Sequence, residues 1–332
     1  MRITVYSATF PTGSAEEEEE MGETAKKVFS CGCIGCLGLA GAIVVAGTVL
    51  WHSTPPLEVT ESRLDRAIPS PQVEAEPALA LPAGEDQPDR SAPRTAGRIV
   101  LDLRDAGAKI LAGRPGDPIK VSAQYDRDTC SLEEDFKPAG GDGEPWQYAV
   151  TFRREHHQSL MRALKEIFGD ASPEVTITLP PDTPLALVAE IQRGGAKLGL
   201  DDLWLTEVDL DVNMGGVEVA ATRPMRAPME RFKAKVAMGG SELSGLAWAS
   251  PASIDLDFRM GGMELDLDGE WLRDADIHIT GRMGGAEVRL PDNVRLEGVP
   301  ERSLSLNDGN ERPGPTLRFE VDCEQGEVEF HR

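Results

Sequence analysis

The sequence predicts a mostly β protein, a single-stranded-repeat β-solenoid of stacked rungs of about 22–24 residues with one short helix. Three observations indicate this fold. The phrase Met-Gly-Gly-x-Glu occurs four times, at intervals of 22 to 24 residues. The residues before each copy alternate apolar and polar, which is the two-residue period of a strand with one buried face. On the polar face the charge changes sign between copies, so that aspartates precede one Met and lysines precede the next.

The repeated phrase predicts a corner in each rung. Gly reaches positive φ without steric cost and permits a close backbone approach, so a Gly pair at a fixed point indicates a bend between two strand segments. The methionines are expected to stack inside as flexible core fillers. A phosphate-binding loop is not indicated because its glycines precede a helix, and a metal-binding Met array lacks His or Cys at constant phase. The predicted structural repeat consists of Met214, Gly215, Gly216, Met238, Gly239, Gly240, Met260, Gly261, Gly262, Met283, Gly284 and Gly285.

The alternation assigns one face of each strand to the core and the other to contacts between rungs. Parallel strands lie about 4.8 Å apart, so stacking in phase places Lys233 between Asp209 and Asp255. Opposite charges on adjacent strands stabilise each other by roughly 0.2–1 kcal/mol. An antiparallel pairing would lose this match. The expected core positions are Val208, Leu210, Val212, Phe232, Ala234, Val236, Ile254, Leu256, Phe258, Ile277 and Ile279.

Weaker elements are expected on both sides of the four copies. Residues 193–198 and 323–330 are predicted to form atypical terminal rungs, because end repeats must cap the stack. The helical spacing of apolar residues between 156 and 168 predicts one short amphipathic helix, with His156 and His157 as surface residues at its start. Further strands are predicted at 99–103, 119–123, 146–152 and 175–180.

An uncharged apolar stretch precedes the folded region. It spans about 22 residues, enough to cross a hydrocarbon core of roughly 30 Å. Lys26 and Lys27 lie just before it, so the positive-inside rule places the N-terminus in the cytoplasm and the C-terminal domain outside the cell membrane, with a single pass. A cleaved signal peptide is the alternative, but the stretch is too long and begins too late. The predicted organisation is a disordered acidic tail at 1–28, a transmembrane helix at 29–52, a Pro-rich linker at 53–97 and an extracytoplasmic β-solenoid domain at 98–332, with full repeats at about 204–292.

The charge and the cysteines restrict the partners. A net charge of −23 makes nucleic acid an improbable partner, because phosphate recognition needs basic surface. Cys31, Cys33 and Cys36 cluster at the cytoplasmic edge of the predicted span, as small interfacial residues or as acylation sites. Cys130 and Cys323 lie in the part expected outside the membrane, where disulfides are permitted. A bridge between Cys130 and Cys323 and two free thiols are therefore both open.

The second half of the chain resembles a known family. The stretch from Ile254 to Val299, with FRMGGMELDL and DADIHITGRMGGAEVRLPDNVRLEGV, resembles the C-terminal domain of LiaF-like, cell-wall-active-antibiotic-response proteins and the related putative-adhesin "toastrack" β-solenoids. The likeness covers about 175–330 well and 98–174 loosely. It implies a membrane-tethered module that senses or transmits envelope stress. LiaF-like proteins commonly have several membrane helices before this domain, whereas this chain has one predicted span and a long linker.

The pattern predicts a binding function and no catalysis. The candidate interaction stripe consists of Glu218, Glu242, Glu264 and Glu287, which fall in one outward column of like charge. A basic partner or a bound cation could compensate it, with Arg259 and Arg282 supplying part, and a solvated acidic stripe is the alternative. The expected partners are a membrane protein or another cell-envelope component, and the lipid bilayer through 29–52. No cofactor or resident metal is expected.

Two other functions are weighed against binding. A polysaccharide-active enzyme would use Asp255 with Asp257, or Asp266 with Asp268, but face alternation alone explains both pairs, and acid–base catalysis needs carboxylates in unlike environments. A surface adhesin-like structural protein is the second alternative. The sequence therefore favours a membrane-anchored, non-catalytic scaffold module in envelope stress sensing or regulation.

Overall fold

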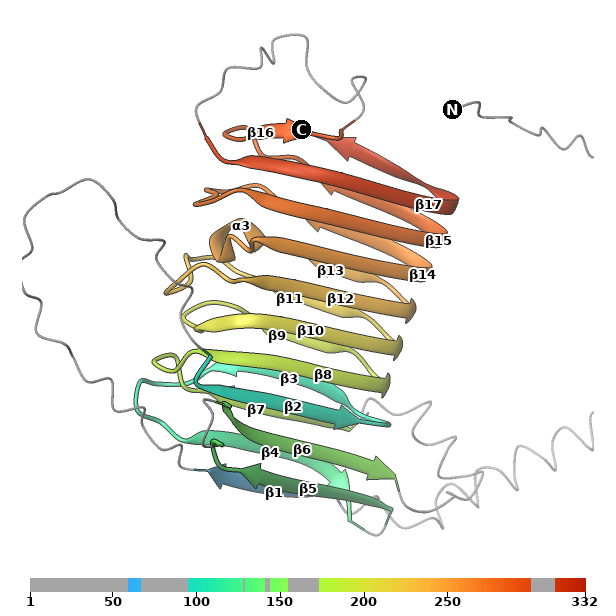
Figure 1. Cartoon of the computed structure of the whole chain (residues 1–332). Coiled ribbons are helices and arrows are strands. Elements are labelled where there is room, and N and C mark those ends of the chain that lie inside the picture. Colours follow the sequence, from blue (N-terminus) through green and yellow to red (C-terminus); the bar gives the residue numbers. More distant parts are fainter. Residues whose placement is uncertain (1–58, 67–94, 128, 141–143, 155–172, 300–313) are drawn as a thin grey trace, which may run out of the picture. The chain divides into compact units, whose positions relative to one another are not determined.

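A computed structural model describes residues 59–66, 95–127, 129–140, 144–154, 173–299 and 314–332 (Figure 1). Every described residue belongs to one compact unit, within residues 56–332. The predicted tail, the transmembrane helix at 29–52 and the helix at 156–168 lie outside the described residues. Within the described ranges, no helix has the length and apolar character needed to cross a bilayer.

The described part is mostly β, as the sequence predicts, and it contains one short helix, at Leu246–Ala249, which the sequence did not predict. All the strands belong to one mixed sheet of 17 strands. The bounds are β1 (Val59–Arg66), β2 (Gly97–Leu103), β3 (Gly107–Ala112), β4 (Ile119–Asp126), β5 (Cys130–Lys137), β6 (Trp146–Arg154), β7 (Glu174–Leu179), β8 (Leu185–Arg193), β9 (Ala196–Gly199), β10 (Leu205–Met214), β11 (Val217–Ala220), β12 (Arg231–Met238), β13 (Ser241–Leu243), α3 (Leu246–Ala249), β14 (Ser253–Asp266), β15 (Ala275–Arg289), β16 (Arg295–Glu297) and β17 (Thr316–His331).

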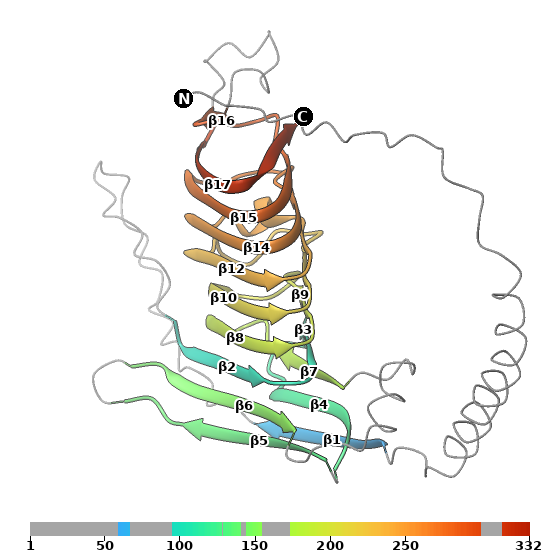
Figure 2. The same ribbon diagram turned by 90° about the vertical axis from the view of Figure 1, so that its right-hand side faces the viewer.

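The strands form a stack of rungs, and each rung has two arms that meet at a corner. The first arm runs through β6, β2, β8, β10 and β12, all parallel, and continues into the first halves of β14, β15 and β17. The second arm runs through β7, β3, β9, β11 and β13 into the second halves of the same three strands. Figure 2 shows the bend in β14, β15 and β17, which each pass through both arms. Antiparallel strands, β5 on one arm and β4 with β1 on the other, close the N-terminal end.

The register confirms the in-phase stacking of the repeats. Lys233 pairs with Asp209 on one side and with Asp255 on the other. Its Nζ lies 3.2 Å from Oδ2 of Asp209, and the Nζ of Lys235 lies 2.8 Å from Oδ2 of Asp211. All the predicted core positions are buried, and they form one continuous core between the two arms. The predicted strands near residues 99, 119, 146 and 175 are present as β2, β4, β6 and β7.

The expectation that the methionines fill the core is wrong. Met214, Met238, Met260 and Met283 are 38–48% exposed. In the first rung the alternation of buried and exposed residues ends at Val212 and resumes at Val217. The methionine falls in the corner between these two positions, beyond the edge of the core. Because the four methionines pair in register, they form an exposed column at the corners of the rungs.

One further expectation needs correction, and the state of two cysteines can be assigned. Residues 59–66, within the segment predicted as linker, form β1 and pair with β4, which would otherwise present an open edge. Of the two states left open for Cys130 and Cys323, the structure has two free thiols. Cys130 lies on β5 and Cys323 on β17, at opposite ends of the stack, so about eight strand spacings of roughly 4.8 Å separate them. A disulfide needs Cα atoms within about 7 Å.

Candidate functional site

The first glycine of each pair is required by the fold. At Gly239 the φ angle is +149°, and a Cβ atom would lie 1.7 Å from the carbonyl oxygen of Gly215 in the rung before. The same contact recurs at Gly261, where a Cβ would meet the carbonyl of Gly239 at 1.7 Å. Only a residue without a side chain allows backbones to approach this closely at the corner.

The second glycine of each pair is not required in the same way. A Cβ atom at Gly262 would meet nothing within 4 Å, and at Gly240 and Gly285 the nearest atoms would lie 3.8 and 3.7 Å away. The contact is tighter at Gly216, at 3.2 Å. In the last rung the position beside Gly285 is occupied by Glu327, on whose other side no described strand pairs.

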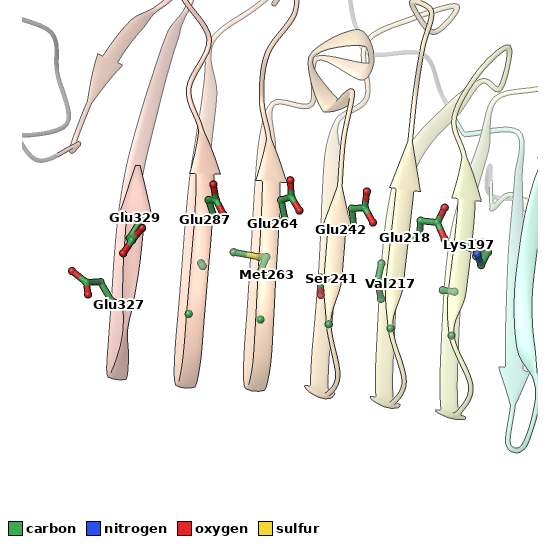
Figure 3. A pocket seen from close by; sticks show the side chains of 17 residues that line it. Lys197, Val217, Glu218, Ser241, Glu242, Met263, Glu264, Glu287, Glu327 and Glu329 are labelled. Atoms are coloured by element: carbon green, nitrogen blue, oxygen red, sulfur yellow. Dashed lines mark ion pairs between the residues drawn. The ribbon is translucent and has the colours of Figure 1, made fainter. Parts of the chain in front are cut away.

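These second glycines form the floor of a groove on the outer face of the second arm. The groove has a volume of about 780 Å³ and crosses six successive rungs. Gly195, Gly216, Gly240, Gly262 and Gly285 lie along it, and Glu327 ends the column. Figure 3 shows the glutamate side chains in a row beside this floor. The groove exists because five rungs in succession lack a side chain at this position.

The predicted glutamate stripe forms one wall of the groove. Glu218, Glu242, Glu264 and Glu287 pair in register, and Glu329 of β17 extends the column by one rung. We refer to these five residues as the glutamate column. The sequence-based stripe did not include Glu329, because the last rung lacks the Met-Gly-Gly phrase. The phrase Gly-Glu-Val-Glu near the end of β17, at 326–329, was the signal that could have identified it.

The two ends of the glutamate column carry positive or titratable partners. The Nζ of Lys197 lies 2.7 Å from Oε2 of Glu218. This hydrogen bond and the charge of Glu218 raise the pKa of Lys197 above its ordinary value, so the end of the column stays paired over the physiological range. At the other end, Nε2 of His331 lies 3.7 Å from Oε1 of Glu287 and 3.4 Å from Oε2 of Glu329.

The middle of the glutamate column forms no ion pair among the described residues, although Lys197 interacts with Glu242 at longer range. No ion pair is formed there by Glu242 or Glu264. Arg259 and Arg282, which the sequence suggested as compensation, form no ion pair with the column within the described ranges. Arg259 instead lines a separate hollow on the first arm with Glu190 and Asp211. The centre of the groove is therefore a run of like charge at about 4.8 Å spacing.

The carboxylates considered for catalysis take part in contacts between rungs. Asp255 pairs in register with Lys233 and His278, and Asp266 lies 3.2 Å from Nη1 of Arg289. Asp266 also accepts a hydrogen bond from the backbone N–H of Asp268 in a turn. Among the residues that the structure describes, no group of three or more His, Cys, Asp or Glu is arranged to hold a metal ion. The glutamates of the groove follow one another along the stack instead of converging on one point.

Comparisons with known proteins give structural likeness only. No family model and no curated protein matches the sequence. A solved structure described as a "putative cell adhesion protein" from Clostridium sporogenes covers 82% of this chain and 99% of its own, at 11% identity and a TM-score of 0.33. A "putative adhesin" from Bacteroides fragilis covers 83% and 98%, at 7% identity and a TM-score of 0.37. A third, from Parabacteroides distasonis, covers 82% and 97%, at 10% identity and a TM-score of 0.26. These low values leave the function to be argued from the site.

Proposed function

We propose that the chain is a membrane-anchored, extracytoplasmic binding and scaffold module, non-catalytic, in which a β-solenoid presents the groove to a protein partner in the cell envelope. The groove carries this proposal, because it is a continuous hollow lined by a column of carboxylates. Glu242 and Glu264, at the centre of this column, form no ion pair among the described residues. Within the described residues the acidic centre has no partner of its own. A positively charged segment of another protein is the occupant that complements it.

The solenoid suits such a role physically. Each rung contacts only its neighbours, so the stack holds a rigid, extended surface in which one chemical feature recurs at every step. A predicted single span at 29–52 would anchor it, and the predicted positive-inside topology would place the groove outside the membrane. The resemblance to LiaF-like proteins suggests that the partner takes part in sensing envelope stress, and this assignment is part of the proposal.

The test is capture of the partner from the groove in intact cells. A photoreactive amino acid replaces Glu242 in the full-length protein, and the same substitution at Glu133, an exposed residue on β5, serves as the control. We expect position 242 to capture one identified envelope protein with an exposed basic segment, and position 133 not to capture it. Equal capture from both positions, or capture of nothing at 242 in cells under envelope stress, would refute the proposal.

A further inference from the structure

We propose that the ligand of the groove is an extended basic peptide segment, rich in Lys or Arg, that lies along the stack and crosses the rungs. This inference rests on the proposed function and specifies its ligand. The groove crosses the strands on the outer face of the second arm and ends on β17. A peptide that lies across the rungs is held by side-chain charge and by contact with the glycine floor. It does not add a strand to the sheet.

The length of the groove sets the length of the segment. The glutamate column crosses five rungs, from Glu218 to Glu329, and four spacings of about 4.8 Å give roughly 19 Å. An extended chain rises about 3.3 Å per residue. About six residues therefore span the column, with alternate side chains facing the glutamates.

The charges define where the segment lies. Glu218 is already paired with Lys197, and the column beyond it continues as Lys197 and Lys109 in the preceding rungs. A cationic chain is repelled by these lysines and attracted by the glutamates. The basic residues of the ligand therefore lie over Glu242 and Glu264, which form no ion pair among the described residues, and extend toward Glu287, beside which His331 lies.

The floor favours a peptide over a glycan. Among the described residues that line the groove there is no aromatic side chain against which a sugar ring could stack. The floor is glycine backbone flanked by methylene groups of the glutamates. Lys and Arg have long apolar stems that pack along such a surface while the charged group reaches a carboxylate.

The second glycines distinguish this proposal from a merely solvated acidic stripe. A solvated stripe needs only the glutamates and gives no reason for glycine beside them. Glycine in a strand costs roughly 0.5–1 kcal/mol relative to alanine, and at Gly262 neither φ nor a steric contact demands it. At Gly240 and Gly285 the nearest atom would lie 3.8 and 3.7 Å from a Cβ atom, which is ordinary van der Waals contact. A hollow kept open for a ligand accounts for the glycines.

The experiment measures the affinity of fluorescent hexalysine for the full-length protein in detergent at low ionic strength. The decisive variant is Gly262→Val, which fills the groove without changing net charge. We expect hexalysine to bind wild type, to bind Gly262→Val about tenfold or more weakly, and to lose affinity as salt rises. Equal affinity for both proteins would show non-specific attraction to an acidic chain and would overturn the proposal.

A second variant covers the case in which Gly262→Val does not fold. Glu242→Gln with Glu264→Gln removes two charges from the groove, and Glu133→Gln with Asp135→Asn removes two exposed charges from β5. We expect weaker binding of hexalysine for the first pair only. A chitosan hexamer tests the alternative ligand class. If wild type binds chitosan more tightly than hexalysine, and Gly262→Val binds chitosan more weakly than wild type does, the ligand is an amino-sugar polymer. The peptide assignment is then wrong.

The outcomes also separate this inference from the proposed function. If crosslinking at position 242 captures an envelope protein while hexalysine binds wild type and Gly262→Val alike, the groove binds a partner through other chemistry. If crosslinking captures nothing, the proposed function fails regardless of what hexalysine does.

Discussion

The Nζ of Lys235 lies 2.8 Å from Oδ2 of Asp211, although 24 residues separate them along the chain. The two residues are adjacent because they occupy the same position in consecutive rungs. Asp257 occupies that position in the next rung, so Lys235 stands between two carboxylates. The ion pairs on this face therefore form only when consecutive rungs are in phase.

Reversing the charge of Lys235 should destabilise the stack. Lys235→Asp removes favourable contacts with Asp211 and Asp257 and replaces them with repulsion, so we expect the free energy of unfolding to fall by about 1–2 kcal/mol. Urea unfolding at low salt measures the change, and 1 M salt should reduce it because these side chains are partly exposed. Lys137→Asp is the control. Lys137 is exposed, and its Nζ lies 3.9 Å from Oδ2 of Asp135, so this ion pair is looser and within one strand. A Lys235→Asp effect no larger than that of the control would contradict a role for register in stability.

The two glycines of one corner should respond oppositely to alanine. Gly239→Ala places Cβ 1.7 Å from a backbone carbonyl at positive φ, so the corner must open. We expect a loss of about 2 kcal/mol or more in the free energy of unfolding. Gly240→Ala in the same rung meets its nearest atom at 3.8 Å and should be neutral or stabilising by up to about 1 kcal/mol. Thermal unfolding of the pair measures both, and equal losses would show that the second glycine is also structural.

Much of the repeat region follows from the sequence because its signals are local and periodic. Each strand from residue 208 to 279 alternates apolar and polar residues, and a slip of one residue would expose the whole core face. Lysines that follow aspartates at the rung interval then fix the order of the rungs. The phrase Met-Gly-Gly-x-Glu predicted the corner and the glutamate column for the same reason.

The sequence could not reveal features that depend on which residues meet in space. The methionines follow the alternation yet lie outside the core, because the corner begins before them and no local pattern marks where it begins. The short strand β3 was not predicted, because its own sequence is a weak signal and its partners, β7 and β9, are distant in the chain. The groove forms because glycines that packing does not require are aligned in five successive rungs. The sequence shows the glycines, but only the coordinates show that a Cβ atom at Gly262 would meet nothing within 4 Å.

Neutralising the centre of the glutamate column should stabilise the free protein. Glu264 lies between Glu242 and Glu287 in register, so Glu264→Gln relieves two repulsive contacts. We expect the free energy of unfolding to rise by about 0.5–1 kcal/mol at low salt, against the usual direction for a substitution. Glu133→Gln, with the same charge change on β5, should alter it by less than about 0.5 kcal/mol. A fall in the stability of Glu264→Gln would mean that the column is compensated in the free protein.

The last prediction concerns a turn that joins the second arm of one rung to the next. Oδ1 of Asp201 accepts hydrogen bonds from the backbone N–H groups of Thr222 and Arg223, at 2.6 and 3.0 Å, and Oδ2 accepts one from Oγ1 of Thr222 at 2.7 Å. Burial alone would raise the pKa of Asp201, but these hydrogen bonds outweigh it and hold the pKa below its ordinary value of 3.8. The carboxylate of Asp201 thus replaces the backbone acceptors that the turn lacks.

Replacing Asp201 by Asn should weaken this turn in a pH-dependent way. Because the folded pKa is lowered, the ionised carboxylate stabilises the fold fully above pH 3.8, and this contribution is lost as the pH falls through the folded pKa. We expect Asp201→Asn to reduce the free energy of unfolding by about 1 kcal/mol at pH 7, and the difference from wild type to shrink below pH 3.8. Asp202→Asn is the control, since Asp202 makes only an exposed ion pair with Arg223. Urea unfolding at pH 7 and pH 3 measures both variants, and a difference that stays constant across this range would show that the Asp201 charge does not stabilise the turn.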